Sequence, residues 1–154
     1  MTGRHPALAR LDVLVGRWTV QPKVEGVGTA RAEFGWQDDG AFLRQFTDAD
    51  SIPSTAPQAW QDNAPFPTTA LIGLDDAAEQ FTMLYADARG VHRVYRMTFA
   101  DGMWRIWRDA PGFNQRFTAT VGADGNRIDG RWEMSQDGAT WRPDFELSYV
   151  RETA

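Results

Sequence analysis

Residues 11–20, with the sequence LDVLVGRWTV, mark the point where a short helical lead-in becomes the first strand of the chain. A glycine just before a strand permits close approach of another backbone or of a large side chain. Trp18 follows Gly16 by two residues, so both point to the same face, because strand side chains alternate with period 2. We interpret Trp18 as the side chain that fills the closed end of a β-barrel whose wall is formed by the rest of the chain.

The segment before this stretch, residues 6–15, has a helical pattern. Pro6 suits a first helical position, and Leu8, Leu11 and Leu14 recur at a spacing that places them on one face. A helix this short is not stable alone. We therefore expect it to lie across the closed end of the barrel.

From residue 17 onward the apolar pattern changes to period 2, and turn residues interrupt it about every ten to twelve positions. Asp-Gly steps such as Asp101-Gly102 are the strongest turn signals, because glycine adopts a positive φ at little cost. Consecutive hairpins predict an all-β fold, a single antiparallel up-and-down barrel, since closure removes the two exposed edges. A two-sheet sandwich is the alternative. About ten strands are predicted, at 17–24, 27–36, 41–48, 68–74, 80–86, 91–99, 103–108, 113–121, 127–135 and 140–151.

The composition narrows the classes of function. With 154 residues the chain is expected to form one domain, 1–154. A net charge of −5 argues against a nucleic-acid partner. The chain has no cysteine, which excludes disulfides and thiolate metal sites and fits a reducing compartment. Residues 1–10 lack a secretory pattern and no apolar run is long enough to span a bilayer, so we expect a cytoplasmic protein.

Residues 50–67 are the exception to the strand pattern. The segment contains four prolines and reaches a length at which an irregular connection is usually functional or disordered. Trp60 and Phe66 argue against disorder, because disordered segments are poor in aromatic residues. We interpret the segment as a flap over the open end of the barrel, with Trp60 or Phe66 against a ligand or the rim. A surface insertion without a role is the alternative.

Two motifs resemble the calycin group, which comprises lipocalins, fatty-acid-binding proteins and nitrobindin-type barrels. Residues 14–18, LVGRW, look like the Gly-x-Trp start of the first strand in that group, and residues 145–151, FELSYVR, look like its closing strand. The resemblance implies that the basic residue of the closing strand, here Arg151, packs over Trp18. The match of GRWE at residues 130–133, followed by an Asp-Gly step and a Trp, is similar more specifically to an uncharacterised bacterial lipocalin-like family.

The histidines argue against haem. Nitrobindin-type proteins hold haem through a histidine late in the chain, whereas here no histidine follows His92, and His5 lies in the lead-in. We expect no haem and no other cofactor. No histidine pair has metal-ligand spacing, so no metal site is expected.

Strand parity selects the candidate ligand-binding residues. Arg44, Arg93 and Arg105 share parity with apolar neighbours. Such an arginine either extends to a barrel end, pairs with an acidic residue, or points inward, where a ligand carboxylate or phosphate can bind it bidentately. Fatty-acid-binding proteins use Arg and Tyr in this way, and the resemblance extends that role to this chain. The candidates are Arg44, Arg93, Tyr95, Arg105, Trp107, Phe42, Phe46, Tyr85 and Trp60.

The chain carries no catalytic motif, so its function is not fixed by a signature. Three candidate functions remain. The first is binding of a small hydrophobic or amphipathic molecule in the barrel, an anionic one included. The second is a lipocalin-like cyclase or isomerase that uses Glu33 or Tyr95 as acid or base. The third is an interaction module whose partner binds residues 50–67. Self-association as a homodimer stays open, and no membrane span is expected.

Overall fold

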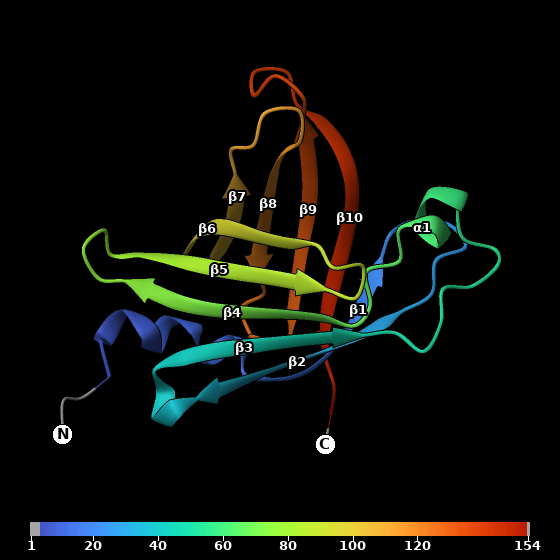
Figure 1. Cartoon of the computed structure of the whole chain (residues 1–154). Coiled ribbons are helices and arrows are strands. Elements are labelled where there is room, and N and C mark those ends of the chain that lie inside the picture. Colours follow the sequence, from blue (N-terminus) through green and yellow to red (C-terminus); the bar gives the residue numbers. More distant parts are fainter. Residues whose placement is uncertain (1–3, 154) are drawn as a thin grey trace.

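The computed structural model describes residues 4–153, and the chain forms a closed antiparallel barrel of ten strands (Figure 1). Each strand pairs with its sequence neighbours, and the first pairs with the last, so the predicted up-and-down barrel is confirmed and the sandwich is wrong. The strands are β1 (Gly16–Pro22), β2 (Ala30–Gln37), β3 (Phe42–Asp48), β4 (Thr68–Asp75), β5 (Gln80–Asp87), β6 (His92–Ala100), β7 (Met103–Arg108), β8 (Asn114–Val121), β9 (Arg127–Ser135) and β10 (Arg142–Arg151).

The lead-in is a 3₁₀ helix, η1 (Pro6–Leu14), and packs against β4 and β6 at one end of the barrel. Its three leucines, Leu8, Leu11 and Leu14, are buried. Their spacing of exactly three residues matches the three residues per turn of a 3₁₀ helix, so all three point to one face. Within residues 4–153, no helix is both long enough and apolar enough to cross a lipid bilayer.

The closed end of the barrel is filled by aromatic side chains. Trp18 is fully buried, and its indole Nε1 donates a hydrogen bond to the Leu14 carbonyl at 2.8 Å, which joins the barrel floor to η1. Tyr149 packs edge-on against Trp18 with ring centroids 6.3 Å apart, and Phe34 lies 6.1 Å from Trp104. Trp18 therefore occupies the position that the sequence predicted for it.

The segment 50–67 contains a short helix, α1 (Gln58–Asp62), that the sequence did not predict. Figure 1 shows α1 at the end of β3 to β5 that lies away from η1. A second short 3₁₀ turn, η2 (Asp38–Gly40), connects β2 to β3. The two helical segments η1 and α1 thus mark opposite ends of the barrel.

Candidate ligand cavity

A cavity of about 240 Å³ lies inside the barrel at the end that carries α1. Its wall is mostly apolar, with contributions such as Val20, Met83, Ile106 and Phe117, and a few polar side chains point into it. This combination is typical of a small-molecule site. The segment 50–67 supplies part of the lining through Trp60, Pro65 and Phe66.

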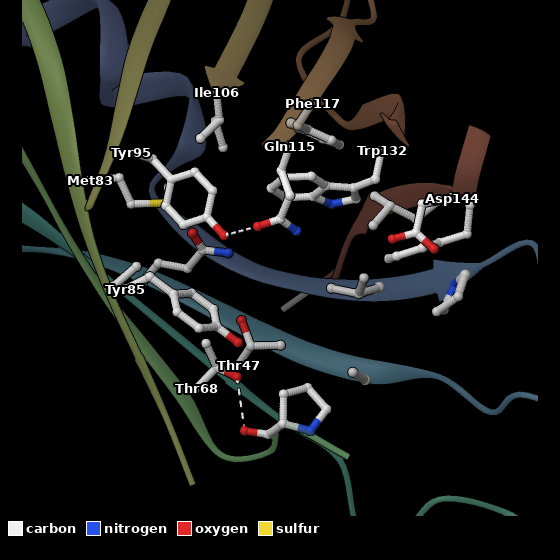
Figure 2. A pocket seen from close by; sticks show the side chains of 18 of the residues that line it. Thr47, Thr68, Met83, Tyr85, Tyr95, Ile106, Gln115, Phe117, Trp132 and Asp144 are labelled. Atoms are coloured by element: carbon white, nitrogen blue, oxygen red, sulfur yellow. Dashed lines mark hydrogen bonds between the residues drawn. The ribbon is translucent and has the colours of Figure 1, made fainter. Parts of the chain in front are cut away.

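A polar cluster on β6 and β8 lies at the cavity wall. The Tyr95 hydroxyl donates to Oε1 of Gln115 at 2.7 Å (Figure 2), and Nη1 of Arg93 donates to the same oxygen at 3.5 Å. A guanidinium can only donate hydrogen bonds, so its contact identifies the atom facing Arg93 as the amide oxygen. The amide nitrogen of Gln115 consequently points away from Tyr95, as Figure 2 shows.

Two hydrogen-bond donors at this wall have no acceptor within the described chain. Nε2 of Gln115 and Nε1 of Trp132 make no hydrogen bond to residues 4–153, although both residues line the cavity. Among the same residues, no fully buried side-chain nitrogen or oxygen lacks a partner. Neither nitrogen is therefore fully buried, and each belongs to a residue that lines the cavity.

The electrostatic environment of this wall favours groups that accept hydrogen bonds. Burial raises the pKa of Tyr95, while the hydrogen bond and charge of Arg93 and the charge of Arg108 act in the opposite direction. The hydroxyl stays protonated at neutral pH and remains a donor. Within residues 4–153 Arg93 forms no ion pair, and its guanidinium lies 5.3 Å from the Phe113 ring centroid.

The tyrosine on the neighbouring strand is held by a carboxylate. The Tyr85 hydroxyl donates to Oδ2 of Asp87 at 2.6 Å, and the same carboxylate forms an ion pair with Arg89 at 2.6 Å. Burial and this hydrogen bond raise the pKa of Tyr85 to about 12. Tyr85 therefore presents its ring to the cavity, while its hydroxyl is already committed to Asp87.

A β-bulge shapes the mouth of the cavity. The pairing of β9 with β10 shifts between Pro143 and Phe145, which leaves Asp144 without a partner on β9. Asp144 and Phe145 both line the cavity, and the Phe145 ring lies 4.9 Å from the Trp60 ring of α1 at an interplanar angle of 74°. Asp144 is exposed at this mouth, and partial desolvation of its carboxyl raises its pKa against the opposing charge of Arg142.

Four of the nine predicted ligand-binding residues line this cavity, and five do not. The four are Trp60, Tyr85, Arg93 and Tyr95, and they come from α1, β5 and β6. The assignment of the other five to the interior was wrong, because their neighbours point inward instead. On the outer face lie Phe42, Arg44, Phe46, Arg105 and Trp107.

On β3, two of the outward residues contact each other. The Arg44 guanidinium covers the Phe46 ring at 5.0 Å from its centroid, while Leu43 of the same strand is fully buried. On β7 the buried side chains are Trp104 and Ile106. Both strands carry apolar residues on each face, so alternation alone does not say which face turns inward.

The two candidate acid or base residues, Glu33 and Tyr95, lie on opposite faces of the barrel wall. Glu33 lies on the outer face with a side chain that is 62% exposed, and it forms an ion pair with Arg17 at 3.7 Å. It does not line the cavity, whereas Tyr95 does. His92 is exposed. Among residues 4–153, no three His, Asp or Glu side chains gather where a metal ion could be held.

Sequence analysis missed Gln115, Trp132 and Asp144. Gln115 shares parity with Phe117 and Ala119 on β8, so a polar residue on an apolar face was a signal that could have been used. Asp144 gives no such signal, because only the bulge brings it to the cavity side.

No protein-family model and no curated protein matches the sequence. Among solved structures, the crystal structure of Rv2717c from M. tuberculosis is similar, with a TM-score of 0.58 over 98% of this chain and 100% of that chain. The two sequences are 15% identical. At this identity the similarity shows a shared barrel fold, and a barrel with an internal cavity is compatible with ligand binding.

Proposed function

We propose that the protein binds a small amphipathic molecule in the barrel, with a carboxylate or carbonyl of the ligand against the guanidinium of Arg93 and Nε2 of Gln115, and with the Tyr95 hydroxyl holding the Gln115 amide in place. The observation that carries the proposal is a pair of donors without acceptors among the described residues of a mostly apolar cavity, Nε2 of Gln115 and Nε1 of Trp132. Beside them lies the guanidinium of Arg93, which forms no ion pair within residues 4–153. An unpaired donor that loses water costs about 1–3 kcal/mol. A ligand acceptor removes that cost, and an anionic acceptor makes a stronger, charge-assisted bond.

The cavity volume limits the size of the ligand. At about 240 Å³ it lies below the range of about 300–1,000 Å³ that is typical of sites for drug-sized molecules. The apolar remainder of the wall suits a short hydrocarbon chain or a single ring. A medium-chain fatty acid such as octanoate is therefore a suitable first probe.

The floor of the barrel supports membership of the calycin group as part of this proposal. The guanidinium of Arg151 lies 4.2 Å from the Trp18 ring centroid, which is the contact that the resemblance implies. Ligand binding within such a barrel is the function that the resemblance favours.

Calorimetric titration with octanoate tests the proposal. We expect the wild-type protein to bind, and Arg93→Met to bind about tenfold to a hundredfold more weakly, because a charge-assisted hydrogen bond is lost. Gln115→Leu should weaken binding in the same direction. Arg105→Met is the matched control, since it makes the same change on the outer face and should leave affinity unchanged. Equal affinities for the wild type and Arg93→Met would overturn the proposal.

A further inference from the structure

We infer that the mouth of the cavity is a site for an ammonium group, formed by the carboxylate of Asp144 and the rings of Trp60 and Phe145. The inference rests on the proposed function and narrows it. The ligand then carries a hydrogen-bond acceptor at one end and a positive nitrogen at the other, as an ω-amino acid does.

The bulge in β10 is the first observation. In a regular strand, adjacent side chains point to opposite faces, so Asp144 and Phe145 could not both face the interior. Because Asp144 is an extra residue opposite β9, both side chains line the same cavity. Bulges are common next to binding sites, where they redirect a side chain. Here the redirected side chain is a carboxylate in an otherwise mostly apolar wall.

The aromatic pair is the second observation. Trp60 comes from α1 and Phe145 from β10, and their rings stand nearly perpendicular at 4.9 Å. In such a pair, the ring that presents its edge keeps both of its faces uncovered by the other. Trp60 and Phe145 line the same cavity as Asp144, and an aromatic face together with a carboxylate recognises ammonium groups, because both attract the same cation.

The carboxylate has no cation of its own. Within residues 4–153, Asp144 forms no ion pair and no side-chain hydrogen bond, although Arg142 lies near enough to affect its charge. Asp144 is solvent-exposed at the mouth of the cavity, so its carboxylate is open to a cation that arrives from solvent. A ligand cation at this position supplies the missing partner.

The two polar positions lie on opposite walls of the barrel. Arg93 belongs to β6 and Asp144 to β10, and these strands are four steps apart in a closed ring of ten. In Figure 2, Asp144 lies across the cavity from Tyr85 and Tyr95. A molecule that spans the cavity from β6 to β10 therefore meets the Arg93 guanidinium at one end and a carboxylate at the other, with Trp132 of β9 on the carboxylate side.

Paired ligands test the inference. Fatty acids with four, six and eight carbons are compared by calorimetry with the ω-amino acids of the same length, at neutral pH. We expect at least one amino acid to bind about tenfold more tightly than its matched fatty acid. Asp144→Asn should abolish this preference and leave binding of the fatty acid unchanged or stronger. Trp60→Leu, which keeps an apolar side chain, should reduce the preference.

The control variant is Glu146→Gln, which neutralises an exposed carboxylate two residues along the same strand. It should retain the preference for the amino acid. If fatty acids bind in an Arg93-dependent manner but no amino acid is preferred, or if Asp144→Asn keeps the preference, the ammonium site is wrong and the proposed function stands. If no fatty acid binds the wild type, the proposed function fails instead.

Discussion

The guanidinium carbon of Arg151 lies over the Trp18 ring, 4.2 Å from the indole centroid, and the guanidinium donates hydrogen bonds to backbone carbonyls. Nη1 donates to the Val15 carbonyl at 2.7 Å, and Nη2 donates to the Gly125 carbonyl at 3.1 Å. Trp18 and Arg151 are also direct partners in the pairing of β1 with β10. One side chain thus joins the lead-in, the first strand, the last strand and the turn between β8 and β9.

We expect Arg151→Lys to lower the free energy of unfolding by about 1–3 kcal/mol, because an ammonium cannot keep both carbonyls and a planar stack. Urea denaturation measures the change. Arg17→Lys is the control, since its side chain is 73% exposed and its effect should stay within about 0.5 kcal/mol. If both variants lose the same unfolding free energy, the contacts of Arg151 do not hold the barrel closed.

Gly16 belongs to the same site: its φ is +125°, and a Cβ there would lie 2.8 Å from Nη1 of Arg151.

Gly130→Ala should crowd the side chains that line the cavity and lower the stability of the barrel. A Cβ at this position would lie 2.6 Å from the Phe117 ring and 2.8 Å from the Ala119 Cβ, and Phe117 already packs against Trp132 at 5.0 Å. Overpacking of this kind costs about 1–3 kcal/mol. Gly35→Ala is the matched control in another strand, because nothing lies within 4 Å of the added Cβ. Thermal denaturation of the two variants should differ, and equal melting temperatures would contradict the packing described here.

Trp60 should report ligand entry. It lines the cavity together with Trp104 and Trp132, so we expect octanoate to change the tryptophan fluorescence of the wild type and a smaller change to remain in Trp60→Phe. Trp141→Phe is the control, because the Trp141 ring stacks on Arg116 at 4.1 Å and does not line the cavity. A fluorescence change of the same size in Trp60→Phe as in the wild type would count against segment 50–67 as a flap.

Lowering the pH should destabilise the folded barrel, because the Asp87 carboxylate becomes protonated. Its side chain is fully buried, and although burial raises its pKa, hydrogen bonds from Arg89 and Tyr85 lower the pKa to about 2, below the ordinary 3.8. Because the folded-state pKa is the lower one, the stabilisation is present above about pH 4 and is lost as the pH falls towards 2. We expect the ionised Asp87 carboxylate to contribute about 1–2 kcal/mol to the free energy of unfolding.

The measurement is urea denaturation of the wild type and of Asp87→Asn across this pH range. The variant should be less stable at neutral pH, and the difference between the two proteins should shrink as the pH falls. A difference that stays constant would show that the Asp87 carboxylate does not titrate with folding.

The order and number of strands could be predicted from the sequence because turn chemistry is local. Steps such as Asp101-Gly102 end one strand and begin the next whatever lies around them, and Gly102 indeed has a φ of +72°. Strand ends were less accurate: the second strand was predicted from residue 27 and begins at Ala30. The contact of Arg151 with Trp18 was also predicted, because residues 14–18 and 145–151 resemble the first and closing strands of the calycin group.

By itself, the sequence determined the alternation of side chains along each strand, the positions of the turns, and the first and last strands that pair to close the barrel. The first two depend only on the period of 2 in a strand and on the φ of single residues. Only the tertiary structure decided which alternating set faces inward on β3 and β7, where both sets contain apolar residues. It placed Arg44 and Arg105 outside and kept Arg93 at the cavity. It also brought Asp144 to the mouth through a bulge. The physical reason is that parity defines two faces, while burial against the other nine strands selects one.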